Sequence, residues 1–390
     1  MLIAALSGRA LAVSARSAGY APLVADLFGD ADMRLAARRS TVLPGDLSSG
    51  LEETALIDSL IRLAAGRRCE GLVYGSGFED RPQSLARVAS LWPLLGNSAD
   101  IVSRAKDPFA FAELCNELGV AHPAVRAKRP FDPRGWLRKR IGGAGGAHVH
   151  PASETSESSD RVYFQRRVSG RAISLLFVAN GKDALALGFS AQWSSPACRA
   201  PARFGGALRP AGIVPRLRRK LASDTQRLAR RLELRGLNSA DFLIDGEKAW
   251  MIEINPRPGA TLDLFDSSSA PLFALHVDAC RGILPEHAPR WCGAAAAAIV
   301  YATRPMPLMP QLEWPEWCAD RQSVGSRVAA GAPICTVRAQ ASSAGRARAM
   351  VEARRLDHHG AETAGSATAP AVDCRRPDRS ARQHHKLRPA

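Results

Sequence analysis

Two carboxylates and an amide occur in the chain at a spacing that could hold a metal ion. Asp245-Gly246 is a turn signal between two short apolar runs, which predicts a β-hairpin. With a three-residue loop that starts at Gly246, Asp241 lies directly opposite Glu253, and opposed residues share a face with Cβ atoms roughly 4.5–5.5 Å apart. Asn255 lies two residues beyond Glu253 and shares its face. The sequence thus places three hard oxygen donors together.

The chemistry that suits such a group is the binding of Mg²⁺ that carries substrate phosphates, because two adjacent carboxylates repel unless a positive charge lies between them. Phe242, Ile252 and Ile254 are predicted to take the opposite face, toward a core. On spacing alone, an ordinary surface hairpin with its polar residues outward is an equally good interpretation.

The elements that precede this hairpin predict a separate α/β domain over residues 1–102. Strand-like and helix-like segments alternate there, which indicates a small doubly wound parallel sheet. Ligands bind such sheets beyond the carboxyl ends of the strands. The turns Ser7-Gly8-Arg9 and Gly75-Ser76-Gly77 lie at two such ends, and either could equally be a plain turn.

Residues 103–290 form the second predicted unit, which ends with the hairpin. A helix is expected over Phe109–Leu118, and an amphipathic basic helix over Pro215–Arg235. Between strand-like segments at Trp136–Lys139 and Ala147–Val149 lies a glycine cluster of Gly142, Gly143, Gly145 and Gly146. The cluster lacks the ending of a P-loop and the third glycine of the dinucleotide motif. It is either a flexible turn or a hairpin flap whose backbone N–H groups close over phosphates.

Two further segments follow. Residues 291–356 are predicted to be β-rich, with strands near Ile299–Ala302 and Ile334–Ala339. Residues 357–390 have no periodicity and are predicted to be a disordered basic tail. Residues 151–160 are predicted to be a mobile loop.

Composition limits the class of protein. No apolar run approaches the ~20 residues of a membrane span, and the eight cysteines form no CxxC pair, so reduced thiols in a cytoplasm are expected. The net charge of +16 could indicate nucleic acid. Arginine and alanine are enriched throughout, however, and the basic helix is most simply a solvated face, so nucleic-acid binding is not expected as the main function.

The segment Glu253-Ile254-Asn255-Pro256-Arg257, with an acid twelve residues upstream, resembles the metal-binding end of the ATP-grasp superfamily. The resemblance implies that Asp241, Glu253 and Asn255 hold Mg²⁺, with Mn²⁺ as an alternative ion, against the phosphates of ATP. It also implies that Arg257 is a catalytic residue that faces the reacting anion. A structural salt bridge is the other interpretation of Arg257.

The order of other residues fits the same family. Lys106 and Lys139 stand where ATP-grasp enzymes have lysines that contact the phosphates, and the glycine cluster resembles the family's flap. Tyr163–Val168 resembles the strand that leads to the adenine pocket, which implies that Gln165 and Val168 contact the nucleotide. The family usually has an acid where Gln165 stands; Gln can still hydrogen bond, and the departure leaves its role open.

The resemblance covers residues 100–290 and implies an ATP-grasp fold, of mixed α/β and α+β class, after the N-terminal domain. It implies a cytoplasmic, ADP-forming ligase that joins a small carboxylate to a small amine. The whole chain is also similar to uncharacterised ATP-grasp proteins of methylotrophic bacteria, associated with tetrahydromethanopterin and methanofuran one-carbon metabolism, which implies biosynthesis of a one-carbon carrier cofactor. A kinase, a carboxylating enzyme and a non-catalytic ATP-binding protein are alternatives, and a homodimer is left open.

Overall fold

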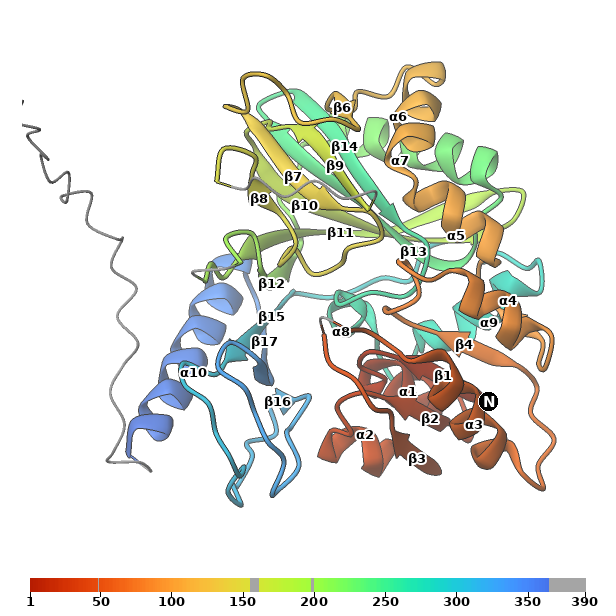
Figure 1. Ribbon diagram of the computed structural model, residues 1–390, viewed down its shortest axis with the longest axis vertical. Coiled ribbons are helices and arrows are strands. Elements are labelled where there is room, and N and C mark those ends of the chain that lie inside the picture. The colour runs from red at the N-terminus through yellow and green to blue at the C-terminus, as the bar shows by residue number, and fades with distance from the viewer. Residues whose placement is uncertain (48, 155–160, 198–199, 365–390) are drawn as a thin grey trace, which may run out of the picture.

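The chain folds around three β-sheets, as Figure 1 shows for the computed structural model. The structure describes residues 1–47, 49–154, 161–197 and 200–364. Within these residues no helix has the length and apolar character to cross a membrane. The observed mixture of a parallel and an antiparallel sheet confirms the predicted fold class.

The N-terminal residues form a five-stranded parallel sheet in the order β3-β2-β1-β4-β5. Its elements are β1 (Leu2–Ala5), α1 (Arg9–Ser17), β2 (Leu23–Asp26), α2 (Ala31–Ala36), β3 (Arg39–Val42), α3 (Glu53–Ala64), β4 (Leu72–Tyr74), α4 (Gln83–Ala89) and β5 (Leu94–Leu95). Alternate residues of β1 belong to two different cores: Ile3 packs with Leu11 of α1, and Leu2 packs with Leu56 of α3. Helices therefore cover both faces, as a doubly wound sheet requires.

An eight-stranded antiparallel sheet forms the centre, in the order β14-β13-β10-β11-β12-β15-β17-β16. Its strands and the helices between them are β10 (Arg171–Asn180), β11 (Ala184–Ser194), β12 (Phe204–Arg209), α7 (Pro215–Leu232), β13 (Arg235–Asp245), β14 (Lys248–Asn255), α8 (Leu262–Phe265) and α9 (Leu272–Cys280). The predicted basic helix is α7, and its leucines, Leu217 and Leu228 among them, pack against Phe177 and Phe242 of the sheet. Its arginines lie on the outward side.

The C-terminal segment continues this central sheet instead of forming a sheet of its own. It contains β15 (Ala294–Tyr301), β16 (Cys318–Ala319), β17 (Pro333–Ala341) and α10 (Ala344–Ala364). Strand β15 pairs with β12, so the strands before and after the predicted boundary at residue 291 belong to the same sheet. The predicted disorder from residue 357 is wrong as far as residue 364, because α10 extends that far. The rest of the tail lies outside the described residues.

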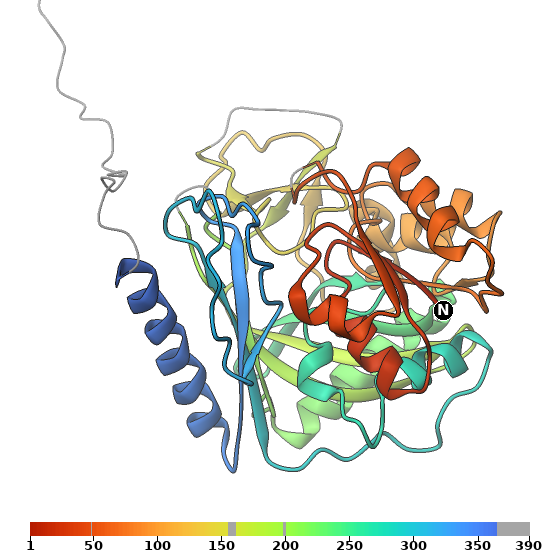
Figure 2. The same cartoon turned by 90° about the horizontal axis from the view of Figure 1, so that it is seen from below.

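A third, four-stranded sheet covers the end of the central sheet near β13 and β14 (Figures 1 and 2). Its strands are β6 (Val125–Arg126), β7 (Trp136–Arg140), β8 (His150–Pro151) and β9 (Val162–Arg166). Strands β7 and β8 pair around the glycine cluster, so the expected hairpin exists, with its second strand slightly later than predicted. Residues 155–160 of the predicted mobile loop lie outside the described residues. Helices α5 (Ala99–Lys106) and α6 (Pro108–Glu117) connect this sheet to the N-terminal one.

Candidate active site

The hairpin of β13 and β14 has a shorter loop than the sequence predicts. Asp245 pairs with Lys248, so the loop is the two residues Gly246-Glu247 and not three. Gly246 has φ +59°, the left-handed conformation that such tight turns need. With this loop and a regular ladder, Asp241 would lie opposite Ile252, on the wrong face for a metal site.

A β-bulge restores the expected pairing. The register shifts between Asp241 and Phe242, so that Phe242 lies opposite Met251 while Asp241 lies opposite Glu253. Ile252 is the extra residue of the bulge, a device that re-aims side chains next to functional sites. Met251 therefore packs in the core, whereas Ile252, which was predicted to lie there, lines a pocket beside Glu253.

The positive charge between the acidic residues comes from Lys106, at the end of α5. Asp107 caps α6 by accepting from the backbone N–H of Phe109 at 2.8 Å, which ends α5 at Lys106. The Lys106 Nζ donates to Glu253 Oε2 at 2.9 Å and to Asn255 Oδ1 at 2.8 Å. A protein ammonium thus binds two of the three donors that were predicted to bind a cation.

The two carboxylates differ in their electrostatics. Burial alone would raise the pKa of Glu253, but Lys106 and Lys139 outweigh it and lower the pKa to about 2. The Glu253 side chain is 39% exposed, and it lines the pocket. Burial, and then repulsion by Glu253, raise the pKa of Asp241 to about 6. In this acid pair, Glu253 therefore gives up its proton more readily than an ordinary glutamate, and Asp241 less readily than an ordinary aspartate.

The donor set fits a divalent cation. Asp241 Oδ2 accepts from Asn255 Nδ2 at 3.0 Å, whereas its buried Oδ1 has no hydrogen bond of standard geometry among the described residues, although Ser174 is its cross-strand neighbour on β10. A cation would satisfy this oxygen and remove the repulsion that raises the Asp241 pKa. The described residues contain no group of three or more His, Cys, Asp or Glu side chains that could hold a metal alone. An ion here would complete its shell with phosphate or water oxygens, as Mg²⁺ commonly does.

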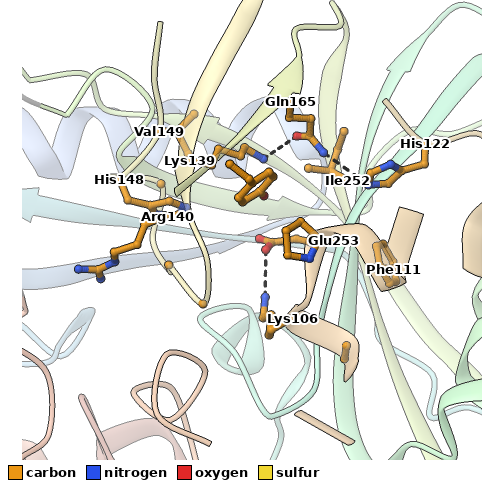
Figure 3. A pocket seen from close by; sticks show the side chains of 16 residues that line it. Lys106, Phe111, His122, Lys139, Arg140, His148, Val149, Gln165, Ile252 and Glu253 are labelled. Atoms are coloured by element: carbon orange, nitrogen blue, oxygen red, sulfur yellow. Dashed lines mark hydrogen bonds and ion pairs between the residues drawn. The ribbon is translucent and has the colours of Figure 1, made fainter. Parts of the chain in front are cut away.

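A pocket lies next to the acid pair, between the flap sheet and α6 (Figure 3). The structure brings seven of the predicted site residues to its wall: Lys106, Lys139, Gly142, Gly143, Gly146, Gln165 and Glu253. Gly145 and Val168 do not line it, because Gly145 lies at the outer turn of the flap and β9 ends before Val168. Asp241, Asn255 and Arg257 lie at its inner end, grouped around Lys106 and Glu253.

The glycines of the flap allow close approach. A Cβ on Gly142, whose φ is +70°, would lie 2.4 Å from the carbonyl oxygen of Glu79 in the N-terminal domain. A Cβ on Gly143 would lie 2.5 Å from the ring of His148. Arg161 donates to the carbonyl oxygen of Asp80, which also fastens the flap to that domain. The flap is therefore closed over the pocket and lies against the loop after β4.

Arg257 forms a buried ion pair with Glu79. Its Nε donates to Glu79 Oε1 at 2.7 Å, and its Nη1 donates to the carbonyl oxygen of Pro258 at 3.4 Å. Glu79 Oε2 accepts from the backbone N–H groups of Gly77 and Phe78 at 2.8 and 3.1 Å. Burial alone would raise the pKa of Glu79, but Arg257 and then Lys106 hold it below its ordinary value. Arg257 therefore does form the salt bridge that was one of its two interpretations. Together, Glu79 and the Pro258 carbonyl hold two of the three guanidinium nitrogens.

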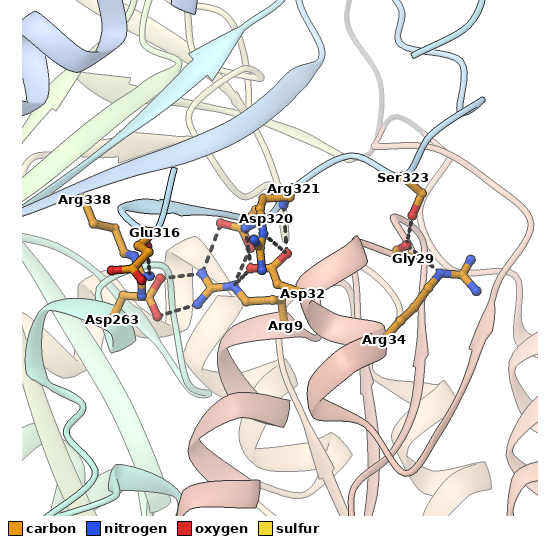
Figure 4. A network of polar contacts seen from close by, with 10 residues as sticks. All are labelled: Arg9, Gly29, Asp32, Arg34, Asp263, Glu316, Asp320, Arg321, Ser323 and Arg338. Carbon is orange, nitrogen blue, oxygen red and sulfur yellow. Dashed lines mark hydrogen bonds and ion pairs between the residues drawn. The ribbon is translucent and has the colours of Figure 1, made fainter. Parts of the chain in front are cut away.

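Of the two N-terminal turns, one therefore reaches the site and the other does not. The turn at Gly75-Ser76-Gly77 carries Glu79 to Arg257. Arg9 is neutralised elsewhere: it donates to Asp263 of α8 and, at 2.9 Å, to Asp320 after β16, as Figure 4 shows. This network fastens α1 to the C-terminal segment.

Three residues near the pocket were missed from the sequence. His148 lies two residues after the last glycine of the cluster, which was a usable signal. Glu79 follows a turn that was singled out, but its partner Arg257 is 178 residues away. His122 belongs to no motif and reaches the pocket only through the fold.

Comparison with known proteins identifies the fold around this pocket. A family model described as an ATP-grasp domain matches residues 105–261. This part of the chain is an ATP-grasp domain. It contains the acid pair, both lysines and the glycine flap, so the resemblance in sequence is confirmed, and with it ATP and Mg²⁺ as the cofactor pair of the class.

Curated relatives and solved structures agree with this assignment. The chain is 25% identical over 206 residues to the carbamoyl phosphate synthase large chain of Myxococcus xanthus, covering 47% of this chain and 19% of that protein. The same protein of Clostridium acetobutylicum is 22% identical over 256 residues, covering 59% and 24%. The chain thus spans about a quarter or less of the length of these relatives.

The structural matches extend beyond the ATP-grasp domain. The biotin carboxylase domain of Hydrogenobacter thermophilus 2-oxoglutarate carboxylase has a TM-score of 0.67 at 11% identity, covering 88% of this chain and 86% of that one. N5-carboxyaminoimidazole ribonucleotide synthetase of Thermus thermophilus has a TM-score of 0.63 at 19% identity, covering 96% and 100%. These likenesses show a shared fold. The relation to one-carbon cofactor biosynthesis stays a prediction.

Proposed function

We propose that the protein is an Mg²⁺- and ATP-dependent ligase that joins a small carboxylate to a small amine through an acylphosphate and releases ADP and phosphate. The observation that carries this proposal is the opposition of Asp241 and Glu253 across a bulged hairpin at the end of a closed pocket. A bulge that sets two carboxylates side by side is costly unless a cation uses them.

The nucleotide would lie in the pocket under the flap. Bound Mg²⁺, held by Asp241, Glu253 and Asn255, would neutralise charge on the β- and γ-phosphates during transfer. Lys106 already bonds Glu253 and Asn255, so it lies where it can turn toward a phosphate. Lys139 adds a second ammonium on the flap side. Phosphoryl transfer needs positioning and charge neutralisation more than covalent help, and these residues supply both.

Arg257 is the residue that we assign to the reacting acid. Glu79 and the Pro258 carbonyl hold its Nε and Nη1, which orients the planar guanidinium. Its Nη2 forms no hydrogen bond in the described part of the chain. An oriented guanidinium can bind a carboxylate, and it can stabilise the oxyanion that forms when the amine attacks the acylphosphate.

A carboxylating reaction is the second candidate. The Hydrogenobacter structure with a similar fold is a complex with MgADP and bicarbonate. Under this hypothesis bicarbonate takes the place of the organic acid at Arg257, and ATP again transfers its γ-phosphoryl group.

The test is Mg²⁺-dependent ATP turnover by the full chain against a panel of acids and amines, with bicarbonate as one of the acids. ADP, AMP, phosphate and product are followed separately. The proposal expects ADP and phosphate only when acid and amine are both present, and loss of turnover in Glu253→Gln. Glu247→Gln is the matched control, because Glu247 is an exposed acid in the turn of the same hairpin. A phosphorylated product, or full turnover by folded Glu253→Gln, would contradict the proposal.

A further inference from the structure

Three side chains from three different segments form a hydrogen-bonded chain along the wall of the pocket (Figure 3). Lys139 of β7 donates from Nζ to Gln165 Oε1 of β9 at 2.8 Å. The Gln165 Nε2 lies 3.4 Å from Nε2 of His122, in the loop between α6 and β6. Gln165 is 2% exposed and Lys139 is 8% exposed, so neither can exchange these partners freely for water.

The chemistry of the groups fixes every proton in this chain. An ammonium has three donors and no acceptor, so the carbonyl oxygen of the Gln165 amide must face Lys139. The amide NH₂ then faces His122, whose Nε2 must accept. The ring proton is consequently on Nδ1, and the ring is neutral. The acceptors that the ring has beside it are backbone groups of Ile252 and Pro123.

The surroundings keep the His122 ring neutral and in place. Burial, and then the positive charge of Lys139, lower its pKa to about 4, although the backbone of Ile252 and Pro123 partly opposes this. The ring packs edge-on against Phe111 of α6, with centroids 5.6 Å apart and planes at 79°. Lys139 is therefore the charged group that acts on the pKa of the ring.

Glutamine in place of an acid changes what Lys139 offers to a ligand. A glutamate at position 165 would form an ion pair with Lys139 and neutralise it. The neutral amide binds the same ammonium without adding a negative charge, so the carboxylates that act on the charge of Lys139 are those of Glu253 and Asp241. An amide is symmetric in shape, however, and rotation by 180° would turn its NH₂ toward the ammonium. An acceptor on the far side prevents that rotation, and His122 Nε2 is this acceptor.

We propose that His122 is a positioning residue of the nucleotide site. By accepting from Gln165 it locks the amide, which holds the ammonium of Lys139 toward the nucleotide phosphates without adding a negative charge beside it. The inference rests on the proposed function only in taking an adenosine phosphate as the ligand. It makes the pocket selective for phosphate charge rather than for the adenine base.

Binding of ATP and of adenosine to the full chain in the presence of Mg²⁺, measured by calorimetry, separates positioning from mere structure. His122→Phe keeps an aromatic ring against Phe111 but removes the acceptor. We expect the Kd for ATP to rise roughly tenfold, because the buried Gln165 amide is left without its acceptor. Adenosine should bind as in the wild type. Gln165→Glu should likewise weaken ATP more than adenosine, because it neutralises Lys139.

A double variant and two controls complete the test. In the Gln165→Glu background, His122→Phe should weaken ATP binding much less than in the wild type, because a carboxylate has no amide orientation to lock. His287→Phe and Gln340→Glu repeat the same changes at exposed positions and should alter nothing. Equal weakening of ATP and adenosine by His122→Phe, or no weakening of either, would overturn the proposal.

The tautomer gives a test that does not depend on nucleotide binding. Nitrogen NMR shifts of His122 should show a protonated Nδ1 and an unprotonated Nε2 at neutral pH. A proton on Nε2 would overturn the inference even if ATP binds. Failure of the wild type to bind any adenine nucleotide would instead refute the proposed function, and the NMR result would still decide the role of His122.

Discussion

Replacing Glu79 by glutamine should destabilise the protein strongly, because Glu79 is half of a buried ion pair. The side chains of Arg257 and Glu79 are 10% and 3% exposed, and their Nε and Oε1 atoms are 2.7 Å apart. Removal of one partner from a buried pair typically costs about 3–5 kcal/mol, since the other charge is left uncompensated. A glutamine can still accept one hydrogen bond, so we expect about 2–3 kcal/mol, a large fraction of a stability of roughly 5–15 kcal/mol.

Urea unfolding curves of the wild type and Glu79→Gln at several pH values measure this cost. The Glu79 pKa is held below its ordinary value in the folded protein. Its ionised form therefore stabilises the fold above the unfolded pKa of about 4.3, and that stabilisation is lost as the pH falls through the lower folded pKa. The difference between the two proteins should be full at pH 7 and should shrink in acid.

The matched control is Glu70→Gln, which breaks an ion pair with Arg281 that is about half exposed on both sides. Such surface pairs contribute about 0–1 kcal/mol. If Glu79→Gln costs no more than Glu70→Gln, the ion pair does not hold Arg257 and the reasoning fails. Where the ligase assay gives turnover, Glu79→Gln should also lower kcat, because Arg257 loses the group that orients its guanidinium.

Three further outcomes follow from single contacts. Gly143→Ala should raise the KM for ATP roughly tenfold or more by pushing the His148 ring into the pocket, and His148→Ala in the same chain should restore it, as steady-state kinetics will show. Thr225→Val should raise the stability measured by urea unfolding by about 1 kcal/mol, because the buried Thr225 hydroxyl has no hydrogen-bond partner in the part of the chain that the structure describes. Without divalent ions, the melting temperature of Asp241→Asn relative to the wild type should increase as the pH rises from about 4 through 6, because folding raises the pKa of Asp241 to about 6 and its ionisation in this range costs stability.

Local patterns predicted the N-terminal sheet and the basic helix well. Short apolar strands alternate there with helices whose leucines recur at helical spacing, so nearby residues determine each element. Helix α10 shows the limit of a compositional argument. The absence of an apolar stripe after residue 357 indicated disorder, yet the helix that starts at Ala344 continues to residue 364.

The acid pair was placed correctly by an argument that contained two errors. The loop is one residue shorter than predicted, and the bulge at Ile252 adds one residue back. Nothing in the local pattern distinguishes a three-residue loop from a two-residue loop followed by a bulge. Only the side of the hairpin on which Ile252 packs tells them apart, and that depends on the pocket.

Contacts between distant segments could not be read from the chain. Strand β12 pairs with β15, which places Gly206 opposite Ala298. Both segments read as short apolar strands, and neither sequence indicates which strand it pairs with. Lys106 was singled out through its place in the family pattern, yet its bonds to Glu253 and Asn255 appear only in the fold. Neither a family motif nor a local sequence pattern marked His122 as a residue of the site.

The central claim is that Asp241 and Glu253 hold a divalent ion against the phosphates of ATP. Electron paramagnetic resonance of Mn²⁺, titrated into the full chain with and without ATP, tests it most directly. The account predicts one or two tightly bound ions in the presence of ATP, lost in Asp241→Asn and Glu253→Gln and retained in Glu247→Gln. Mn²⁺ and ATP binding that is unchanged in both acid variants would contradict the account.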